Sequence, residues 1–492
     1  MNFFKELNSS TAFPVCYNLL PHFAPSGQQH QGLMDCVRQT LEDGRIRTFF
    51  LTDRPAGPPG ISSMQLADEI LAAGGEPLVS LALTFDDRNT IIKKLREYCQ
   101  IGVQQFLFVT GEYPAADENG QPEPLFDLDS VQLLMLLDKM QEATDTAKGC
   151  AVSPFKYLES EQVWQYEKLK RKISVGANFV ITQLGYDIRK FDELVQFCKA
   201  AKITTPLVAN VFITDLAAAQ LVQNERMNGV MVPDRLLGTL RNEETGTQGA
   251  RGKRIARTAK LLTILKELGY HGALLGSTTA GFSEVQQVLD HAEELSVDWQ
   301  VFLEELDYAD GRFYYFQKDS QTGLNSTRPA PVAPKHFPNP IYSFSYFVDW
   351  LVYVPQGPLF KVTGRFCHFC NGRKFWYSFI WLQEYLSKRM LYGCEMCGDC
   401  VLYACGFLCY RSGCPKKMVN GPCGGSQDGY CEVFPDKTCF WVRVYNNMKG
   451  VRQHITYVAP PIPARDARLD RSSSWINFFM GKDHRRMKQD SD

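Results

Sequence analysis

Cysteine is distributed very unevenly along this chain. Of sixteen cysteines in 492 residues, eleven lie between Cys367 and Cys439. The preceding residues hold the other five, which are Cys16, Cys36, Cys99, Cys150 and Cys198. Inside the rich segment, cysteines recur at every third position from Cys394 to Cys400, and Cys414 is followed by proline. Because such spacing can bring several thiolates to one point, the sequence predicts a metal or cluster module attached to a larger, cysteine-poor domain.

The spacing favours an iron–sulfur cluster, with zinc as the alternative. Three thiolates in a C-x-x-C-x-x-C run, followed by a Cys-Pro pair, are typical of proteins that hold a [4Fe–4S] cluster. We expect its ligands among Cys394, Cys397, Cys400, Cys409, Cys414 and Cys423. A tetrahedral zinc site would instead pair two C-x-x-C knuckles, such as Cys367 to Cys370 with Cys394 to Cys397. Eleven thiols could also supply two sites.

Disulfides are the third interpretation of these cysteines. The opening residues MNFFKELNSS have mixed charge and no apolar signal core, and a large cysteine-poor domain precedes the cluster. Both features favour a reducing, cytoplasmic environment over a secreted one.

The first three hundred residues alternate short apolar runs with longer amphipathic stretches. Such an alternation, repeated eight times, predicts a (β/α)8 barrel, and an open doubly wound sheet is less favoured because no G-x-G-x-x-G follows the first run. The expected strands are 13–19, 47–52, 78–83, 105–110, 149–153, 178–183, 206–212 and 272–276. Helical periodicity is clearest in 89–100, 131–144 and 259–268, whereas Val230 to Pro233 is an apolar run without a clear place.

Composition and proline content divide the chain into four parts. We expect the barrel in residues 1–310, a proline-rich connector in 311–340, the cysteine-rich domain in 341–460 and a C-terminal tail in 461–492 with an aromatic anchor near Trp475. A net charge of −1 gives no electrostatic reason to expect nucleic acid or a membrane surface. The apolar stretch from Ile341 to Phe360 contains Asp349 and Pro355, so we expect a buried or interface segment and not a membrane span.

Polar residues end the predicted strands, at the edge where barrels of this class carry their chemistry. They include Asn18, Thr52, Thr110, Gly111, Glu112, Thr182 and Gln183. The segment Leu169 to Gln183 (LKRKISVGANFVITQ), with Asp187 four residues on, resembles the LKRKxxAGAxxxITQxxFD motif of methylenetetrahydrofolate reductase, and Phe108 to Pro114 (FVTGEYP) resembles its LRGDxP turn. The resemblance covers residues 1–310. Segments 394–402 and 414–425 resemble the zinc or iron–sulfur domain that accompanies this reductase in several bacterial enzymes.

The resemblance implies a flavin barrel, with FAD or FMN, that exchanges a hydride with a folate one-carbon unit. It places Glu112 near the flavin pyrimidine and Gln183 beside the folate, whose pterin edge an amide can serve as donor and acceptor at once. Thr52, Thr110, Gly111, Glu112 and Thr182 are the expected flavin contacts.

Two positions depart from the family pattern. Asn18 stands where the family has the glutamate that protonates the methylene bridge, and an amide cannot deliver a proton at neutral pH. Thr110 and Glu112 replace the Arg and Asp of the LRGD turn. His22 could substitute for the missing acid because imidazole titrates near pH 7. The candidate catalytic set is therefore Asn18, His22, Glu112 and Gln183.

These observations predict a flavin-dependent oxidoreductase that interconverts 5,10-methylene- and 5-methyl-tetrahydrofolate. The cysteine domain would relay electrons to or from a redox partner protein, because a flavin can take electrons singly and pass them on as a hydride. The alternative is a folate-binding or methyl-transfer component that has lost reduction, since Asn18 replaces the acid. We expect a cytoplasmic oligomer with no membrane span and no nucleic-acid partner.

Overall fold

The computed structural model describes residues 3–9, 12–19, 28–53, 62–114, 123–140, 145–224, 229–245, 249–277, 281–295, 298–308, 311–331, 339–449 and 460–485. They form two compact units. The barrel unit comprises Met1–Pro331 together with Gly424–Asp428, and the cysteine unit comprises Val332–Cys423 and Gly429–Asp492. The short segment Gly424–Asp428 therefore belongs with the barrel although cysteine-unit residues flank it in sequence.

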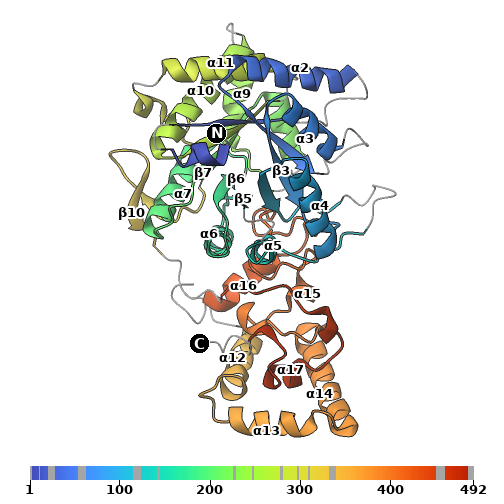
Figure 1. The fold of residues 1–492 in the computed structure, drawn as a ribbon. Helices are drawn as coiled ribbons and strands as arrows, with labels where there is room; N and C mark the ends of the chain where they lie inside the picture. Colours follow the sequence, from blue (N-terminus) through green and yellow to red (C-terminus); the bar gives the residue numbers. More distant parts are fainter. Residues whose placement is uncertain are drawn as a thin grey trace. The chain divides into compact units, whose positions relative to one another are not determined.

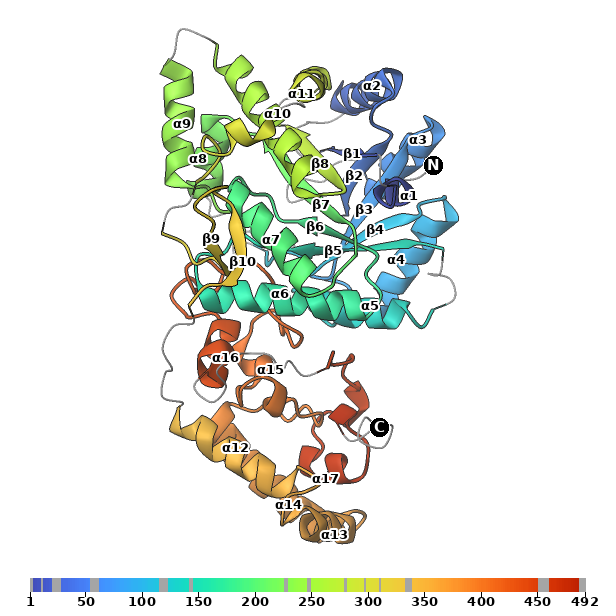
Figure 2. The ribbon, with the colours of Figure 1, turned by 90° about the vertical axis from the view of Figure 1, so that its left-hand side faces the viewer.

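Eight parallel strands close into a barrel in the order β1 to β8 (Figure 2). Their bounds are β1 Val15–Asn18, β2 Thr48–Asp53, β3 Glu76–Ala82, β4 Gln105–Val109, β5 Ala147–Val152, β6 Phe179–Thr182, β7 Leu207–Ile213 and β8 Gly272–Ser277. Closure is made by β1 pairing with β8, with Val15 opposite Ala273. The predicted (β/α)8 barrel is confirmed, and every expected strand lies within two residues of its observed bounds.

Helices surround the strands (Figure 1). They are α1 Phe3–Leu7, α2 Gln28–Asp43, α3 Ser63–Ala72, α4 Arg88–Gln100, α5 Ser130–Leu137, α6 Glu159–Ser174, α7 Ile188–Ala200, α8 Leu216–Asn224, α9 Asp234–Thr245, α10 Ala250–Leu268 and α11 Ser283–Glu294, with a 3-10 turn η3 at Trp299–Phe302. Asp87 begins α4 by accepting a hydrogen bond from the Thr90 amide, and Asp129 begins α5 through a capping box with Gln132. The run at Val230 to Pro233 forms no strand and leads into α9.

Apolar side chains from α1 and from the strands of the barrel pack into one cluster. Phe50, Leu78, Phe179 and Leu274 come from strands on all sides, and Phe3 and Leu7 of α1 pack onto the same cluster. Burial of this set explains why short α1 is ordered, since a five-residue helix has little stability of its own.

The residues expected to form a connector begin with a hairpin, β9 Phe316–Lys318 and β10 Asn325–Pro329. The hairpin is fixed to α7, because Arg189 Nε donates to Asn325 Oδ1 at 3.0 Å and Asn325 Nδ2 donates to Asp192 Oδ2 at 2.8 Å. The barrel unit accordingly continues to Pro331.

The cysteine unit begins with three helices, α12 Pro340–Val352, α13 Phe360–Cys370 and α14 Lys374–Tyr392. A mostly irregular, cysteine-bearing stretch follows, with η4 Leu402–Ala404, α15 Tyr410–Gly413, α16 Phe440–Lys449, η5 Ala467–Leu469 and α17 Ser474–Phe479. Cys367, Cys370 and Ile380 pack with Ile476 and Phe478 to form its core. None of the helices in the described parts of the chain is both long and apolar enough to cross a bilayer.

Candidate functional site

Asn18 is the last residue of β1, at the carboxyl-end mouth of the barrel. Its carboxamide oxygen is buried and accepts no hydrogen bond within the part of the chain that the structure describes. A buried acceptor without a donor costs folding free energy, which a ligand N–H or O–H group would recover. Asn18 is therefore suited to hold a ligand donor, and its amide chemistry gives it no proton to deliver.

Gln183 follows β6 directly at the same end of the barrel. Its backbone N–H donates to the Val152 carbonyl at 2.7 Å, and its side-chain Oε1 accepts from the Leu184 N–H at 2.9 Å. The second bond holds the carboxamide oxygen against the Leu184 N–H, and the Nε2 group lies beside Gly229. Thr182 uses its hydroxyl differently, as acceptor for the Asn210 N–H at 2.9 Å. The Thr182 side chain thus joins neighbouring strands.

The turn after β4 is held by its backbone. Gly111 has φ of +84°, and a Cβ there would lie 2.2 Å from Thr84 Oγ1. Thr84 Oγ1 donates to the Glu112 carbonyl at 3.0 Å, while the Glu112 side chain is exposed and the Thr110 side chain is buried. Thr52, at the end of β2, accepts from the Ser63 hydroxyl through its carbonyl at 2.7 Å.

Two residues from the sequence motifs have other places. His22 lies outside the described residues. Asp187 is fully buried, begins α7 by accepting from the Arg189 N–H at 3.0 Å, and accepts from the Tyr314 hydroxyl at 2.6 Å. Burial raises the pKa of the Asp187 carboxyl. The aspartate of the motif is thus a helix cap and hairpin anchor in this chain.

Lys156, which the sequence reasoning missed, lies four residues past the end of β5. Its side chain is 1% exposed, and its Nζ donates to the carbonyls of Gly424 at 2.5 Å and Ser426 at 2.6 Å. A Cβ on Gly229 would lie 2.7 Å from the Gly424 oxygen and 3.2 Å from Gln183 Nε2, so these groups crowd around one point. Segment Gly424–Asp428 is therefore part of the wall beside Gln183. The signal in the sequence that could have identified Lys156 is its position shortly after the end of a predicted strand.

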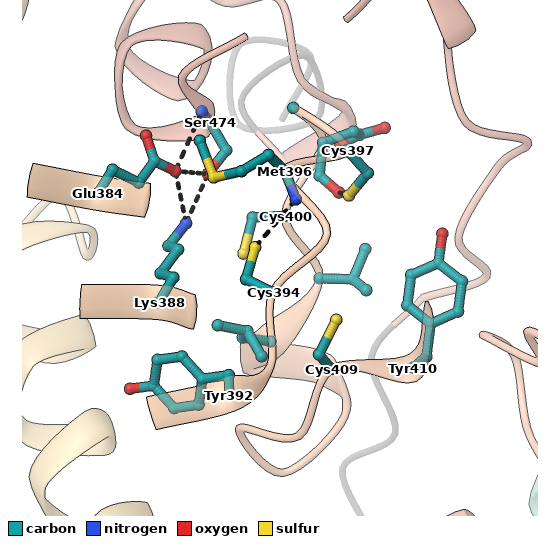
Figure 3. Close-up of a pocket in the computed structure, with 14 residues that line it drawn as sticks. Glu384, Lys388, Tyr392, Cys394, Met396, Cys397, Cys400, Cys409, Tyr410 and Ser474 are labelled. Atoms are coloured by element: carbon teal, nitrogen blue, oxygen red, sulfur yellow. Dashed lines mark hydrogen bonds and ion pairs between the residues drawn. The ribbon is translucent and has the colours of Figure 1, made fainter. Parts of the chain in front are cut away.

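In the cysteine unit, four thiols line one cavity. They are Cys394, Cys397, Cys400 and Cys409, the first four of the expected cluster ligands. Figure 3 shows the sulfurs of Cys394 and Cys400 side by side, with Cys409 reaching toward them from a later segment. Burial raises the pKa of Cys394 to about 11 and of Cys397 to about 12. Ionising several buried thiols at one place is unfavourable, because their negative charges repel one another away from water. A bound cation would offset this cost.

A charged pair from α14 forms another wall of this cavity (Figure 3). Lys388 Nζ donates to Glu384 Oε1 at 2.8 Å and to Ser474 Oγ at 2.6 Å. Glu384 also accepts from the hydroxyls of Ser473 and Ser474, each at 2.6 Å, at the start of α17. Burial lowers the pKa of Lys388, but Cys400 and Glu384 raise it more, so it stays a cation beside the thiols.

A second group of cysteines interacts separately. Cys414, Cys423 and Cys439 lie within electrostatic range of one another, and Cys431 lies near Cys414 and Cys439. Lys416 and Glu432 form a buried ion pair beside them, and Cys423 Sγ donates to Glu432 Oε1 at 3.3 Å. Cys414 and Cys423, which the spacing grouped with the first set, are thus placed with this second one.

The zinc pairing of Cys367 and Cys370 with Cys394 and Cys397 is not formed. Cys367 and Cys370 lie in the apolar core of the unit and do not line the thiol cavity. Among the described residues, no three His, Cys, Asp or Glu side chains come close enough to hold a single metal ion.

A larger cavity of about 240 Å³ shares Cys400, Lys388 and Ser474 with the thiol cavity. Seven of its lining residues are aromatic, namely Phe344, Tyr353, Tyr392, Tyr403, Phe407, Trp475 and Phe478. One polar wall carries the ion pair between Asp349 and Arg485, with nitrogen–oxygen distances of 2.7 and 3.0 Å. The thiol set is thus flanked by an apolar space inside its own unit.

Among solved structures, the barrel is similar to a protein from Clostridium thermocellum described as binding two copies of 5-methyl-5,6,7,8-tetrahydrofolic acid. The TM-score is 0.43 at 13% identity, over 59% of this chain and 98% of that one. A putative dihydrodipicolinate synthetase from Pseudomonas aeruginosa gives a TM-score of 0.34 at 11% identity, over 60% of this chain and 83% of that one. Scores this low carry no argument about function.

Sequence comparison is more specific. A probable methylenetetrahydrofolate reductase (NADPH) of Caenorhabditis elegans is 22% identical over 187 residues, which are 36% of this chain and only 27% of that protein. A family model described as methylene-tetrahydrofolate reductase C terminal matches residues 378–468. The model described as methylenetetrahydrofolate reductase matches residues 22–273, which is more than half of the chain. The chain therefore belongs to the methylenetetrahydrofolate reductase family.

Proposed function

We propose that this protein is a flavin-dependent oxidoreductase that interconverts 5,10-methylene- and 5-methyl-tetrahydrofolate. The observation that carries the proposal is Gln183, the glutamine of the family's ITQ motif, at the carboxyl end of β6 in a barrel whose family is established. Its fixed carboxamide suits a pterin edge, which offers donors and acceptors side by side. The buried, unpartnered oxygen of Asn18 at the end of β1 supports a ligand in the same mouth.

The flavin, FAD or FMN, would bind among the strand ends that carry Thr52, Thr110, Gly111 and Thr182. Gly111 supports this because its left-handed backbone exposes peptide groups where side chains would otherwise stand. When bound, a flavin supplies the hydride chemistry. The residues of the chain then bind and orient the folate and exclude water from the mouth.

We further propose that Cys394, Cys397, Cys400 and Cys409 hold a [4Fe–4S] cluster that relays electrons between a redox partner and the barrel. Four thiols around one cavity, a lysine cation beside them and the C-x-x-C-x-x-C spacing support this. Zinc is the competing occupant.

The test is an anaerobic preparation in which flavin, iron and zinc are quantified on the same sample. We expect one flavin, about four iron atoms per occupied cluster, and methylene-tetrahydrofolate reduction by a low-potential dye. Failure to retain or titrate either flavin would refute the oxidoreductase. Stoichiometric zinc without iron would refute the relay and leave the barrel proposal standing.

A second candidate function is favoured by Asn18, which puts an amide where the family acid stands. The protein would then bind folate, or act in methyl transfer, without efficient reduction of the methylene form. General acid catalysis is worth about 10²- to 10⁴-fold, so Asn18→Glu should raise methylene-folate reduction by a factor in that range. Asn18→Gln, which has the length of glutamate without its proton, is the matched control and should not. Rapid reduction by the wild type, unchanged in both variants, would place the proton donor elsewhere.

A further inference from the structure

Helix α14 presents its apolar side to solvent. Phe375, Phe379, Leu382, Leu386 and Met390 follow one another at steps of three and four residues, which places them along one face of a helix. All five are exposed, from 45% for Leu382 to 82% for Met390. Such a stripe normally faces a protein core, so here it indicates a surface that is covered in the functional state.

The two preceding helices also expose apolar side chains, and Phe369 of α13 contacts Trp376 of α14, with ring centroids 6.1 Å apart. Val362, Phe366 and Phe369 are exposed at helical spacing on α13, and Phe344, Phe347 and Trp350 are exposed at helical spacing on α12. Figure 1 shows these three helices in succession within the cysteine unit. We call the exposed side chains of α12, α13 and α14 the aromatic face.

The aromatic face is not a core that has failed to pack. The opposite sides of the same helices already have their core, in which Cys367, Cys370 and Ile380 pack against α17. The buried side of α14 also carries the ion pair of Glu384 and Lys388. If the apolar stripe of α14 were meant to face this core, these two charged side chains would point to solvent instead. The helices are therefore fully seated in their unit, and the aromatic face is an additional surface.

Residues 340–392, which include these three helices, carry more positive than negative charge. Residues 340–392 contain only two carboxylates, Asp349 and Glu384, and both are engaged inside the unit by Arg485 and Lys388. Five basic residues are exposed, and in the described parts of the chain none of them pairs with a carboxylate. They are Lys361, Arg365, Arg373, Lys374 and Arg389. Most stand directly beside a residue of the aromatic face, such as Lys374 beside Phe375 and Arg389 beside Met390.

This pattern selects among possible occupants. A second copy meeting this face across a two-fold axis would set five unpaired positive charges against five others, which is unfavourable. Interfaces between proteins are depleted of lysine, yet here Lys361 and Lys374 are exposed next to apolar residues of the aromatic face. Helices that lie in the headgroup region of a membrane have this composition instead. Their apolar side carries Phe, Trp, Leu and Met, and Lys and Arg stand at its edges.

We propose that the aromatic face docks the protein on the surface of an anionic lipid bilayer, without crossing it. Apolar side chains of α12, α13 and α14 would enter the boundary between headgroups and acyl chains, and the five basic residues would contact lipid phosphates. Docking would be reversible and salt-dependent, because screening weakens the phosphate contacts.

The test is sedimentation of the full chain with vesicles of phosphatidylcholine alone and of an equimolar mixture with phosphatidylglycerol. We expect binding to the anionic vesicles, weaker binding at high salt, and a blue shift of tryptophan fluorescence from Trp350 and Trp376. Replacing Phe375, Phe379 and Leu386 together by serine should weaken the partition about tenfold or more, since each loses apolar burial. Replacing Lys361, Arg365 and Lys374 together by glutamine should weaken binding to the anionic vesicles and remove most of its salt dependence.

Leu221→Ser on α8 and Val301→Ser on η3 are matched controls, because both are exposed apolar residues outside the aromatic face. They should bind vesicles like the wild type. Circular dichroism checks that each variant folds. Absence of binding to either vesicle would overturn the proposal. So would lipid-free association, by light scattering, that the triple serine variant abolishes, because the face would then join copies of the chain.

Discussion

The barrel unit and the cysteine unit use their helices in opposite ways. Around the barrel, amphipathic helices turn their apolar sides inward, as in α4, where Ile91 and Leu95 are buried against the strands. In the cysteine unit, α14 buries the ion pair of Glu384 and Lys388 and exposes Phe375 and Met390. The difference shows that apolar periodicity in a helix predicts a buried face reliably only where the same chain supplies the surface against which that face packs. Each unit also has its own core, so we expect two separate unfolding transitions in calorimetry.

Loss of a proposed cluster ligand should have the largest effect and should affect one unit only. A bound metal centre can supply about 10 kcal/mol of folding free energy to a small domain. In anaerobically prepared protein, Cys397→Ser should remove bound iron and abolish or strongly lower the cysteine-unit transition while the barrel transition stays. Cys198→Ser, at a buried barrel thiol, is the control and should retain the iron. An unchanged cysteine-unit transition in Cys397→Ser would mean that this unit folds without a metal centre.

Breaking a buried ion pair should cost about 3 to 5 kcal/mol in whichever unit contains it. Glu384→Ala leaves the Lys388 ammonium buried and removes the acceptor at the start of α17, so it should lower the cysteine-unit transition. The counterpart is Glu193→Ala in the barrel, where the side chains of Lys190 and Glu193 are completely buried. If each variant lowered both transitions equally, the two units would not unfold independently.

A smaller effect should distinguish two barrel glycines that share a left-handed backbone. Gly111 and Gly74 have φ of +84° and +87°, but a Cβ on Gly111 would lie 2.2 Å from Thr84 Oγ1, and one on Gly74 would meet nothing within 4 Å. We expect Gly74→Ala to cost about 1 kcal/mol through backbone strain alone, and Gly111→Ala to cost about 1 to 3 kcal/mol more through overpacking. Thermal denaturation of both variants measures the difference. Equal losses would show that Thr84 moves aside freely.

Mild acid should have the smallest effect and should act oppositely on the two units. Burial raises the pKa of Glu193 in the barrel, so its contribution to stability grows as pH falls from the raised pKa toward the ordinary value near 4. For Glu384 burial raises the pKa, but Lys388 and the serine hydroxyls lower it more. Its contribution is therefore lost as pH falls below the ordinary value. Calorimetry from pH 7 to below pH 4 should show the cysteine-unit transition falling relative to the barrel transition, less so in Glu384→Gln. Parallel movement of both transitions would contradict this.

The barrel strands could be predicted because each is a short apolar run between amphipathic stretches. Their order around the barrel followed, because eight such units close into a barrel in the order in which they occur in the sequence. The grouping of thiols could be predicted only in part. Cys394, Cys397 and Cys400 are close in sequence, so their common cavity follows from spacing, whereas Cys414 and Cys423 join Cys431 and Cys439 through a longer loop that spacing does not define. Whole-chain net charge near zero also concealed the local excess of basic residues in 340–392.

At the barrel mouth, sequence could suggest Asn18 and Gln183 because both end strands. Lys156 was missed because its partners are backbone carbonyls of Gly424 and Ser426, far away in sequence and without side-chain signature. The structural use of Asp187 was also hidden, since a helix cap and a catalytic carboxylate look alike in a motif.

The placement of Gly424–Asp428 in the barrel unit has a consequence for how the protein is made. Synthesis proceeds from the N-terminus at about 5–20 residues per second, so β8 emerges from the ribosome well before this segment. During that interval Lys156 has no acceptors from the segment, and the wall beside Gln183 is unfinished. The eight-stranded barrel can therefore close before the wall beside Gln183 is complete, and that wall is completed only after most of the cysteine-rich segment has been translated. Nascent chains stalled before and after residue 428 would differ at the wall beside Gln183 while sharing the same barrel.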